Sequence, residues 1–379
     1  MLSRGHGDAS LKRLLRKSDI FFDNDFHHAS ITSQQHEIAK MAEKQGFYDI
    51  SKPRFDLSSY TGRLAYFYST TSPLTLLAST SQLEQAQQDV QHYEGLIKEA
   101  GVKGCYVPEQ DKERYWNARQ LVNSSIHPDT GKPVPLPFRM SAFVPTNLII
   151  CAGMLMPNPS LRSVIFWQWA NQTLNVAVNF SNANKSIEMT PQEIGTAYVA
   201  ATATSVALAV SLTRLVPRLR VSPTAKQLLG RLVPFVSVAS AGVVNISCIR
   251  WKEMRDGVEV YKLTRKPDTG EEDRSVLGKS PKAGQMAVMQ SAASRVFTNV
   301  PTLIIPPMVM TLLERRNAFV GPRGKLLSNL SNLTLIGLSL GLFLPPAIAY
   351  FPQRASVDPK KLESEFQGNE GPVYFNKGL

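Results

Sequence analysis

The last two thirds of the chain alternate apolar runs that carry no charge with polar loops that hold the ionisable side chains. The runs cover residues 141–157, 195–213, 232–249, 296–313 and 328–351. Each is close to the roughly 20 residues that a helix needs to cross about 30 Å of hydrocarbon. Core helices of a large soluble α protein are the alternative, and five uncharged runs argue against it. We expect an all-α fold, a polytopic helical membrane protein with about five transmembrane helices.

The five runs differ in strength. The run 141–157 is short and contains Pro145 and Asn147, so whether it crosses the bilayer completely stays open. The run 195–213 is rich in Ala, Thr and Ser, a composition that in lipid favours close helix packing over exposure to acyl chains. We therefore expect this second run inside the bundle.

The first 140 residues are polar and nearly balanced in charge, with 17 basic and 16 acidic side chains, and predict a soluble, mainly helical region. One helix is expected from near Ser81 to Gly101 and a second around residues 109–124. The stretch 47–73, rich in aromatic residues, Ser and Pro, is expected to be mostly irregular. The predicted domains are an N-terminal extension (1–46), a soluble region (47–140), a transmembrane bundle (141–351) and a C-terminal tail (352–379).

Loop charge predicts an orientation. With five spans, the N-terminal region shares one side with the loops 214–231 and 314–327, which carry net charges of +5 and +3. The segments on the opposite side carry net charges between zero and +2. The positive-inside rule then puts the N-terminus inside, which in a mitochondrion is the matrix.

Composition and motifs argue against several function classes. The formal net charge of +12 comes without zinc-finger spacing, a basic heptad helix or an aromatic RNA-binding signature, so no nucleic-acid partner is expected. Cys105, Cys151 and Cys248 form neither a CxxC site nor a disulfide framework. The chain contains no Walker loop, GxSxG, dinucleotide or HExxH motif, so we expect no enzyme, no cofactor and no metal site.

Amide side chains concentrate in one segment between the first two runs. They are Gln168, Asn171, Gln172, Asn175, Asn179 and Asn182. At about 100° per residue they fall within about 100° of helical arc and form an uncharged polar stripe. Amides offer donors and acceptors without fixing a charge in lipid, so the stripe is a candidate pathway for a polar solute. On this hypothesis Asn175→Ala and Asn179→Ala lower transport without lowering membrane insertion.

The alternative for this segment is an interfacial helix that shows its amide stripe to water. Interfacial helices usually carry Lys or Arg on the polar face, and the segment from residue 168 to 182 carries neither. The sequence leaves both interpretations open.

The last two apolar runs contain prolines, and the fourth begins beside a charged residue and an amide. The residues concerned are Arg295, Asn299, Pro306, Pro307, Pro345 and Pro346. Such helices should kink or break, and a helix broken near the midplane frees backbone groups that can bind a carboxylate or an ammonium. Two alternatives stay open, because packed spans tolerate prolines and Arg295 can snorkel to the interface.

The string HPDTG at residues 127–131 sets His127 beside Asp129 and invites a catalytic or metal interpretation. A Pro-Asp-Thr-Gly stretch is first a turn, in which Gly131 can take a positive φ. The other histidines show no ligand spacing with His127 that matches known sites. We expect a structural motif.

Several strings, in this order, resemble the sideroflexins, also called the tricarboxylate-carrier family. They include DISKPRFDLSSYTGRLAYFY (49–68), HPDTG, RMSAFVP (139–145), FWQWANQTLNVAVNFSN (166–182), GRLVPFVSVASAGVVNI (230–246), IPPMVM (305–310) and LPPAIAYFPQ (344–353). Many collinear and unusual strings are more specific than any single motif. The resemblance extends from about residue 47 to 366, and the first 46 residues lie outside it.

The resemblance implies a multi-span protein of the mitochondrial inner membrane that moves small amino acids, serine above all, into the matrix for one-carbon metabolism. It also implies an N-terminus in the matrix, and serine and the lipid bilayer as partners. The alternative function is a membrane scaffold or assembly factor whose N-terminal region holds other inner-membrane proteins. Deletion of residues 1–46 separates the two, since a scaffold loses partners and a transporter keeps uptake.

Overall fold

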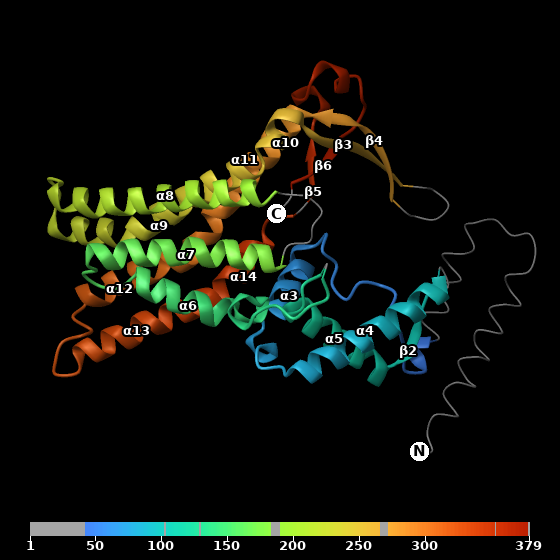
Figure 1. Cartoon of the computed structure of the whole chain (residues 1–379), viewed down its shortest axis with the longest axis horizontal. Coiled ribbons are helices and arrows are strands. Elements are labelled where there is room, and N and C mark those ends of the chain that lie inside the picture. Colours follow the sequence, from blue (N-terminus) through green and yellow to red (C-terminus); the bar gives the residue numbers. More distant parts are fainter. Residues whose placement is uncertain are drawn as a thin grey trace, which may run out of the picture.

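The apolar runs form the helices of a bundle in the computed structural model, which describes residues 42–101, 104–128, 130–182, 190–265, 272–352 and 354–377 (Figure 1). The helices are α6 (Phe143–Met154), α8 (Pro191–Leu215), α9 (Pro223–Ile249), α11 (Pro281–Leu303) with α12 (Ile305–Arg315), and α13 (Gly324–Leu338) with α14 (Leu344–Ala349). Four helical stretches in the described chain are long and apolar enough to cross a membrane. They are Pro191–Arg218, Pro223–Ile249, Pro281–Arg315 and Gly324–Ala349. Helix α6 is apolar but shorter, as expected for the first run.

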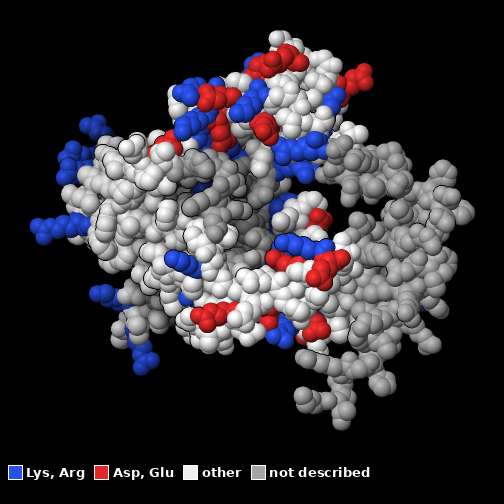
Figure 2. All heavy atoms as spheres, turned by 45° about the vertical axis from the view of Figure 1, so that its right-hand side comes forward, with Lys and Arg blue, Asp and Glu red and all other residues white. Residues whose placement is uncertain are grey.

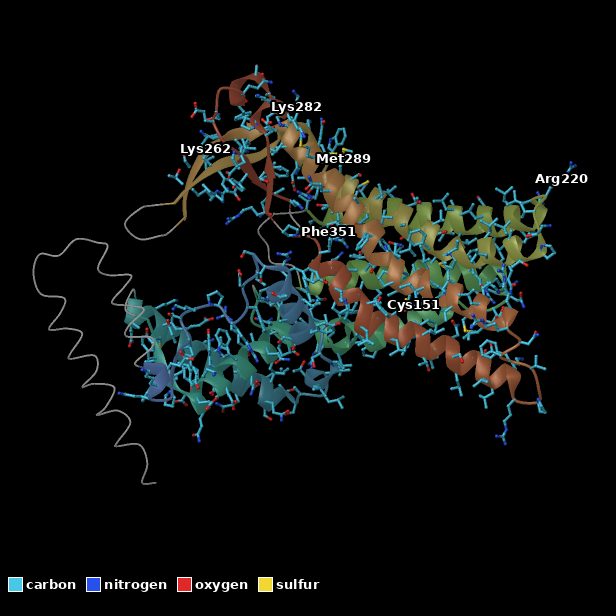
Figure 3. The ribbon with its side chains drawn as sticks, turned by 180° about the vertical axis from the view of Figure 1, so that it is seen from behind. Cys151, Arg220, Lys262, Lys282, Met289 and Phe351 are labelled. Carbon is cyan, nitrogen blue, oxygen red and sulfur yellow. The ribbon has the colours of Figure 1, made fainter. Side chains whose placement is uncertain are left out.

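One helix of the bundle was absent from the predicted span count. Helix α7 (Leu161–Asn182) is 22 residues long, packs against α6 and α8, and runs antiparallel to both (Figure 1). With this helix in the bundle, the N-terminal region and the α8–α9 loop lie at opposite ends (Figure 1). Figure 3 shows Arg220 of that loop at one end and Lys262, which belongs to a small sheet on the side of the N-terminal region, at the other. The prediction that the N-terminal region shares a side with the loops 214–231 and 314–327 is therefore wrong. The amides of α7 lowered its hydropathy and hid the passage.

The two ends of the bundle differ in charge. At the end formed by the α8–α9 and α12–α13 loops, which we call the basic end, Figure 2 shows blue side chains projecting with hardly any red among them. At the other end, acidic and basic side chains are mixed over the N-terminal region and the sheet. The band between the ends is almost free of charge on the face shown, as expected for the part that lipid would cover.

The N-terminal region is built on α4 (Thr80–Ala100) and α5 (Glu109–Ser125), and both predicted helices are confirmed. Ser79 caps α4, because its Oγ accepts from Gln82 N at 3.3 Å while Ser79 N donates to Gln82 Oε1 at 2.9 Å. Gly101 ends the helix with a φ of 54°. Arg114 of α5 binds Asp89 of α4 and holds the pKa of that carboxyl below its usual value.

The stretch 47–73 is more regular than expected. It forms β1 (Phe47–Asp49), which pairs with β2 (Tyr106–Pro108), and α3 (Tyr60–Thr70). Contacts with a distant part of the chain stabilise α3: Arg63 Nε donates to the carbonyl of Ala349 at 2.8 Å, and Tyr68 Oη donates to that of Leu342 at 2.9 Å. These tertiary contacts are invisible in the local pattern, which explains the miss.

A four-stranded antiparallel sheet stands at the same end as the N-terminal region (Figure 1). Its strands are β3 (Val258–Arg265), β4 (Glu272–Ser280), β5 (Arg354–Val357) and β6 (Val373–Asn376), in the order β4-β3-β6-β5. Val260, Val373 and Phe375 pack beneath it with Ala283 and Ala287 of α11. The sheet joins a charged hairpin to the C-terminal tail, and neither segment alone predicted it.

Both predicted helix interruptions are present. Helix α11 ends at Leu303, and α12 begins at Ile305 with Pro306 and Pro307 in its first turn. A π-helical turn, Ser339–Phe343, separates α13 from α14, whose first turn contains Pro345 and Pro346. Leu303 and Leu340, beside the two interruptions, are buried in the same core cluster of the bundle.

Helix α6 approaches α7 closely at Gly153. A Cβ added there would lie 2.1 Å from the indole of Trp167. Gly153→Val should therefore force the helices apart and lower the free energy of unfolding by about 1–3 kcal/mol, the usual cost of overpacking. Thermal unfolding of the detergent-solubilised protein measures the effect. Gly195→Val is the control, because a Cβ there meets no atom within 4 Å; equal losses in both variants would contradict the close approach.

Candidate functional site

The polar stripe of α7 turns into the bundle along the first half of the stripe. Gln168, Asn171 and Gln172 are only 2%, 5% and 4% exposed, whereas Phe166 and Trp169 on the other side of the helix are exposed. The aromatic side faces outward and the amide side faces α8, to which α7 packs. These three amides are therefore not turned to water, as the interfacial-helix alternative would require.

Two hydroxyls of α8 fix the register of α7 on that helix. Ser205 Oγ donates to Gln168 Oε1 at 2.6 Å inside the bundle. The hydroxyls of Thr173 and Tyr198 lie 2.9 Å apart. The run 195–213, which was predicted to lie inside the bundle for its small residues, supplies Ser205 and Tyr198.

The next two amides have no hydrogen-bond partner in the described part of the chain. Asn171 Nδ2 and Gln172 Nε2 are fully buried and unpaired, and so is Thr202 Oγ1 on α8. Since Gln168 pairs with Ser205 on an antiparallel helix, three residues further along α7 and three back along α8 bring Asn171 level with Thr202. Leaving such a group unpaired costs about 1–3 kcal/mol, so this cluster is suited to a ligand that supplies the missing partners.

The other amides of the stripe lie in different surroundings. Asn175 and Asn179 are exposed. Asn182 Nδ2 donates to the carbonyls of Phe138 and Val178, both at 2.8 Å, and so ties the end of α7 to the segment before α6. The structure therefore brings together the first three amides, exposes the next two and uses the last in packing.

Arg295 and Asn299 are on α11, away from α7 in sequence. Asn299 Nδ2 donates to the carbonyl of Arg295 at 2.7 Å, a bond within the helix. The Cβ of Arg295 packs 3.6 Å from the position a Cβ would take on Gly242 of α9. Among the described residues, neither forms a hydrogen bond with the α7 amides.

A cavity of about 700 Å³ opens at the basic end of the bundle. It lies between the α6–α7 loop, α7, the end of α8, the first half of α9, α12 and α13, and its wall includes Gln168, Thr213, Lys226, Arg231, Glu314 and Asn332. Arg231 binds both oxygens of Glu314 at 2.6 and 2.7 Å and Thr311 Oγ1 at 2.7 Å, which joins α9 to α12. Sequence reasoning missed this ion pair, although each charge stands at the edge of an apolar run.

The HPDTG string forms the expected turn. Gly131 has a φ of 64°, its N–H donates to the carbonyl of His127 at 3.0 Å, and His127 N donates to the carbonyl of Lys132 at 2.9 Å. Gln87 Nε2 on α4 binds the carbonyl of Gly131 at 2.7 Å. Asp129 lies outside the described residues. Among those described, no group of three His, Cys, Asp or Glu side chains is arranged to hold a metal ion.

Comparison with known proteins gives collinear matches over most of the chain. The family model described as Sideroflexins matches residues 49–379. Sideroflexin FSF1 of Saccharomyces cerevisiae is 41% identical over 87% of this chain and 97% of its own length. Sideroflexin-1 of Mus musculus is 37% identical over 87% and 97%, and Sideroflexin-5 of Homo sapiens is 32% identical over 88% and 93%. No solved structure gives a significant match.

Proposed function

Because the chain belongs to the sideroflexin family, we propose that this multi-pass membrane protein is a transporter of small amino acids in the mitochondrial inner membrane, with serine as its leading substrate. On this proposal serine enters the matrix, where its hydroxymethyl carbon feeds one-carbon metabolism. The substrate pathway runs along the amide stripe of α7.

The pair of unpaired amides, Asn171 and Gln172, carries the proposal. Their amide groups lie inside a bundle of membrane-length helices, where buried polar groups without partners are costly and mark pathways for solutes. Serine offers a carboxylate, an ammonium and a hydroxyl, which amide donors and acceptors can satisfy. Serine is neutral overall at pH 7, so the membrane potential does not have to drive its passage.

Uptake by proteoliposomes of the purified chain tests the proposal. We expect saturable uptake of labelled serine, weaker uptake of alanine and no uptake of citrate, because an uncharged amide path gives a trianion no counter-charge. Absence of uptake of every amino acid would defeat the transport function.

The orientation in the membrane follows from the charged loops once α7 is counted. The loops of the basic end carry the net positive charge, so the positive-inside rule assigns them to the matrix. The N-terminal region, at the other end, then faces the intermembrane space, which reverses the orientation expected from five spans.

Protease protection measures this orientation. In mitoplasts, whose outer membrane is open, added protease should remove epitopes at both the N-terminus and the C-terminal tail, while a site inserted beside Arg220 stays protected. Intact mitochondria are the control, in which all three are protected. Cleavage beside Arg220 with both termini protected would reverse the assignment.

A scaffold is the second candidate function, and one feature of the N-terminal region favours it. Leu74 and Leu77, between α3 and α4, are 91% and 85% exposed, an unusual state for two neighbouring leucines. A partner protein in the membrane would cover them. Deletion of residues 1–46 remains the discriminating experiment, and co-purification of inner-membrane proteins with Leu74→Ser/Leu77→Ser tests this surface directly.

A further inference from the structure

The amide stripe of α7 passes through three surroundings in sequence. Gln168 lines the cavity at the basic end, Asn171 and Gln172 are buried one turn further, and Asn175 and Asn179 are exposed beyond them. All five side chains fall within the same arc of the helix. Polar groups are costly against lipid, so a continuous line of amides is the pattern expected of a polar route through the bundle. The route is closed at its centre, where Asn171 and Gln172 are buried.

The Gln168–Ser205 hydrogen bond lies between the cavity and the unpaired amides. Gln168 belongs to the wall of the cavity, and its Oε1 accepts from Ser205 Oγ at 2.6 Å. Ser205 is fully buried and comes from α8, so the bond joins α7 to α8 at the depth where the cavity ends. Asn171 and Thr202, one turn deeper, form no such bond in the described chain.

Another part of the cavity wall belongs to α12, a helix segment set off from α11 by a break. Pro307, Met310 and Glu314 of α12 line the cavity, and α12 is separated from α11 by the break at Ile304. The polar bonds recorded between α12 and α9 in the described residues all involve Glu314 or Thr311. A broken helix whose short half is held at its end is a common moving part of transporters.

We infer that the cavity at the basic end is the vestibule through which a small zwitterionic or uncharged polar solute reaches Asn171 and Gln172, and that the Gln168–Ser205 hydrogen bond closes the passage between them. The inference rests on the proposed transport function. The charges on the wall suit such a solute, because Arg231 is paired with Glu314, whereas Lys226, whose Nζ donates to the carbonyl of Pro217 at 3.0 Å, keeps a positive charge that can attract a carboxylate.

Cysteine labelling tests the vestibule and its barrier. The full chain, freed of its own cysteines by Cys105→Ser, Cys151→Ala and Cys248→Ser, carries Asn171→Cys in sealed vesicles. A membrane-impermeant maleimide is applied to the side on which Arg220→Cys reacts, with Lys262→Cys as the reporter of the other side (Figure 3). Thr213→Cys reports on the cavity wall.

We expect Thr213→Cys to react from the Arg220 side. Asn171→Cys should react at least about 10-fold faster in combination with Gln168→Ala or with Ser205→Ala, either of which removes the bond. Trp169→Ala is the matched control, because Trp169 is an exposed neighbour on the other side of α7; it should leave the rate unchanged.

Equal Asn171→Cys rates with Gln168→Ala, Ser205→Ala and Trp169→Ala would overturn the barrier. Reaction of Thr213→Cys only from the Lys262 side would overturn the vestibule. Labelling requires no transported solute, so its outcome can be read even if the uptake of amino acids fails, and the two proposals can therefore fail separately.

Discussion

Replacement of Asn171 by leucine or of Gln172 by methionine is expected to lower the initial rate of serine uptake by about 10- to 100-fold. A hydrogen bond to a charged group contributes about 1.5–3 kcal/mol, and each variant removes one amide that the carboxylate or ammonium of serine would use. Both side chains keep the approximate volume of the amide they replace, so packing against α8 is preserved. The measurement is uptake by proteoliposomes at matched protein content.

Stability separates this role from a structural one. Neither amide has a hydrogen-bond partner in the described chain, so its loss should leave the free energy of unfolding unchanged or raise it by about 1–3 kcal/mol. Asn182→Leu is the matched control on the same helix, because Asn182 is bonded to the carbonyl of Phe138 and its loss should destabilise the protein. If Asn171→Leu destabilised the protein as much as Asn182→Leu and left serine uptake unchanged, the role of the cluster would be structural.

The sequence predicted the parts of the fold that local pattern determines. The helix ending at Gly101 carries its own capping box and terminating glycine, and the last four uncharged runs correspond to membrane-length helices. The breaks at Ile304 and at Ser339–Phe343 follow from prolines that cannot continue a helix. Residues close in sequence determine each of these features.

Other features depend on segments that are distant in sequence. Tyr60–Thr70 is helical partly because Arg63 binds a carbonyl nearly three hundred residues away. Strand β3 pairs with β6, and the helices α11 to α14 lie between the two strands in the sequence. The amide stripe was visible as a pattern, but its division into buried and exposed parts depends on how helices distant in sequence pack around α7. The hypothesis that named Asn175 and Asn179 therefore moves to Asn171 and Gln172, which the packing encloses.

Hydropathy left α7 out of the predicted span count for a physical reason that bears on function. A helix that carries a solute path must trade apolar residues for polar ones, so hydropathy falls where the path runs. Counting spans by hydropathy therefore leaves α7 out, although this helix packs between α6 and α8 in the bundle. The same six amides thus lowered the hydropathy of α7 and marked it as the candidate site.

Arg250→Met is expected to destabilise the protein by about 3 kcal/mol, the low end of the cost of breaking a buried charge pair. Arg250 is 4% exposed at the end of α9, pairs with Glu253, binds Ser291 Oγ of α11 at 2.8 Å and donates to the carbonyl of Lys377 beside β6. Its loss leaves Glu253 without its salt-bridge partner and the C-terminal strand without this tie to the bundle. Thermal unfolding in detergent measures the change.

Arg255→Met is the control for this prediction. Arg255 pairs with Asp256 on the surface, where both side chains are largely exposed, and such pairs contribute about 0–1 kcal/mol. Because Arg250 joins α9, α11 and the tail, its variant should also make the C-terminal residues cleavable by protease at temperatures where Arg255→Met resists. Equal behaviour of the two variants would show that the remaining contacts hold the tail without Arg250, among them the β3–β6 pairing and the bond from Ser291 Oγ to the carbonyl of Lys377 at 3.1 Å.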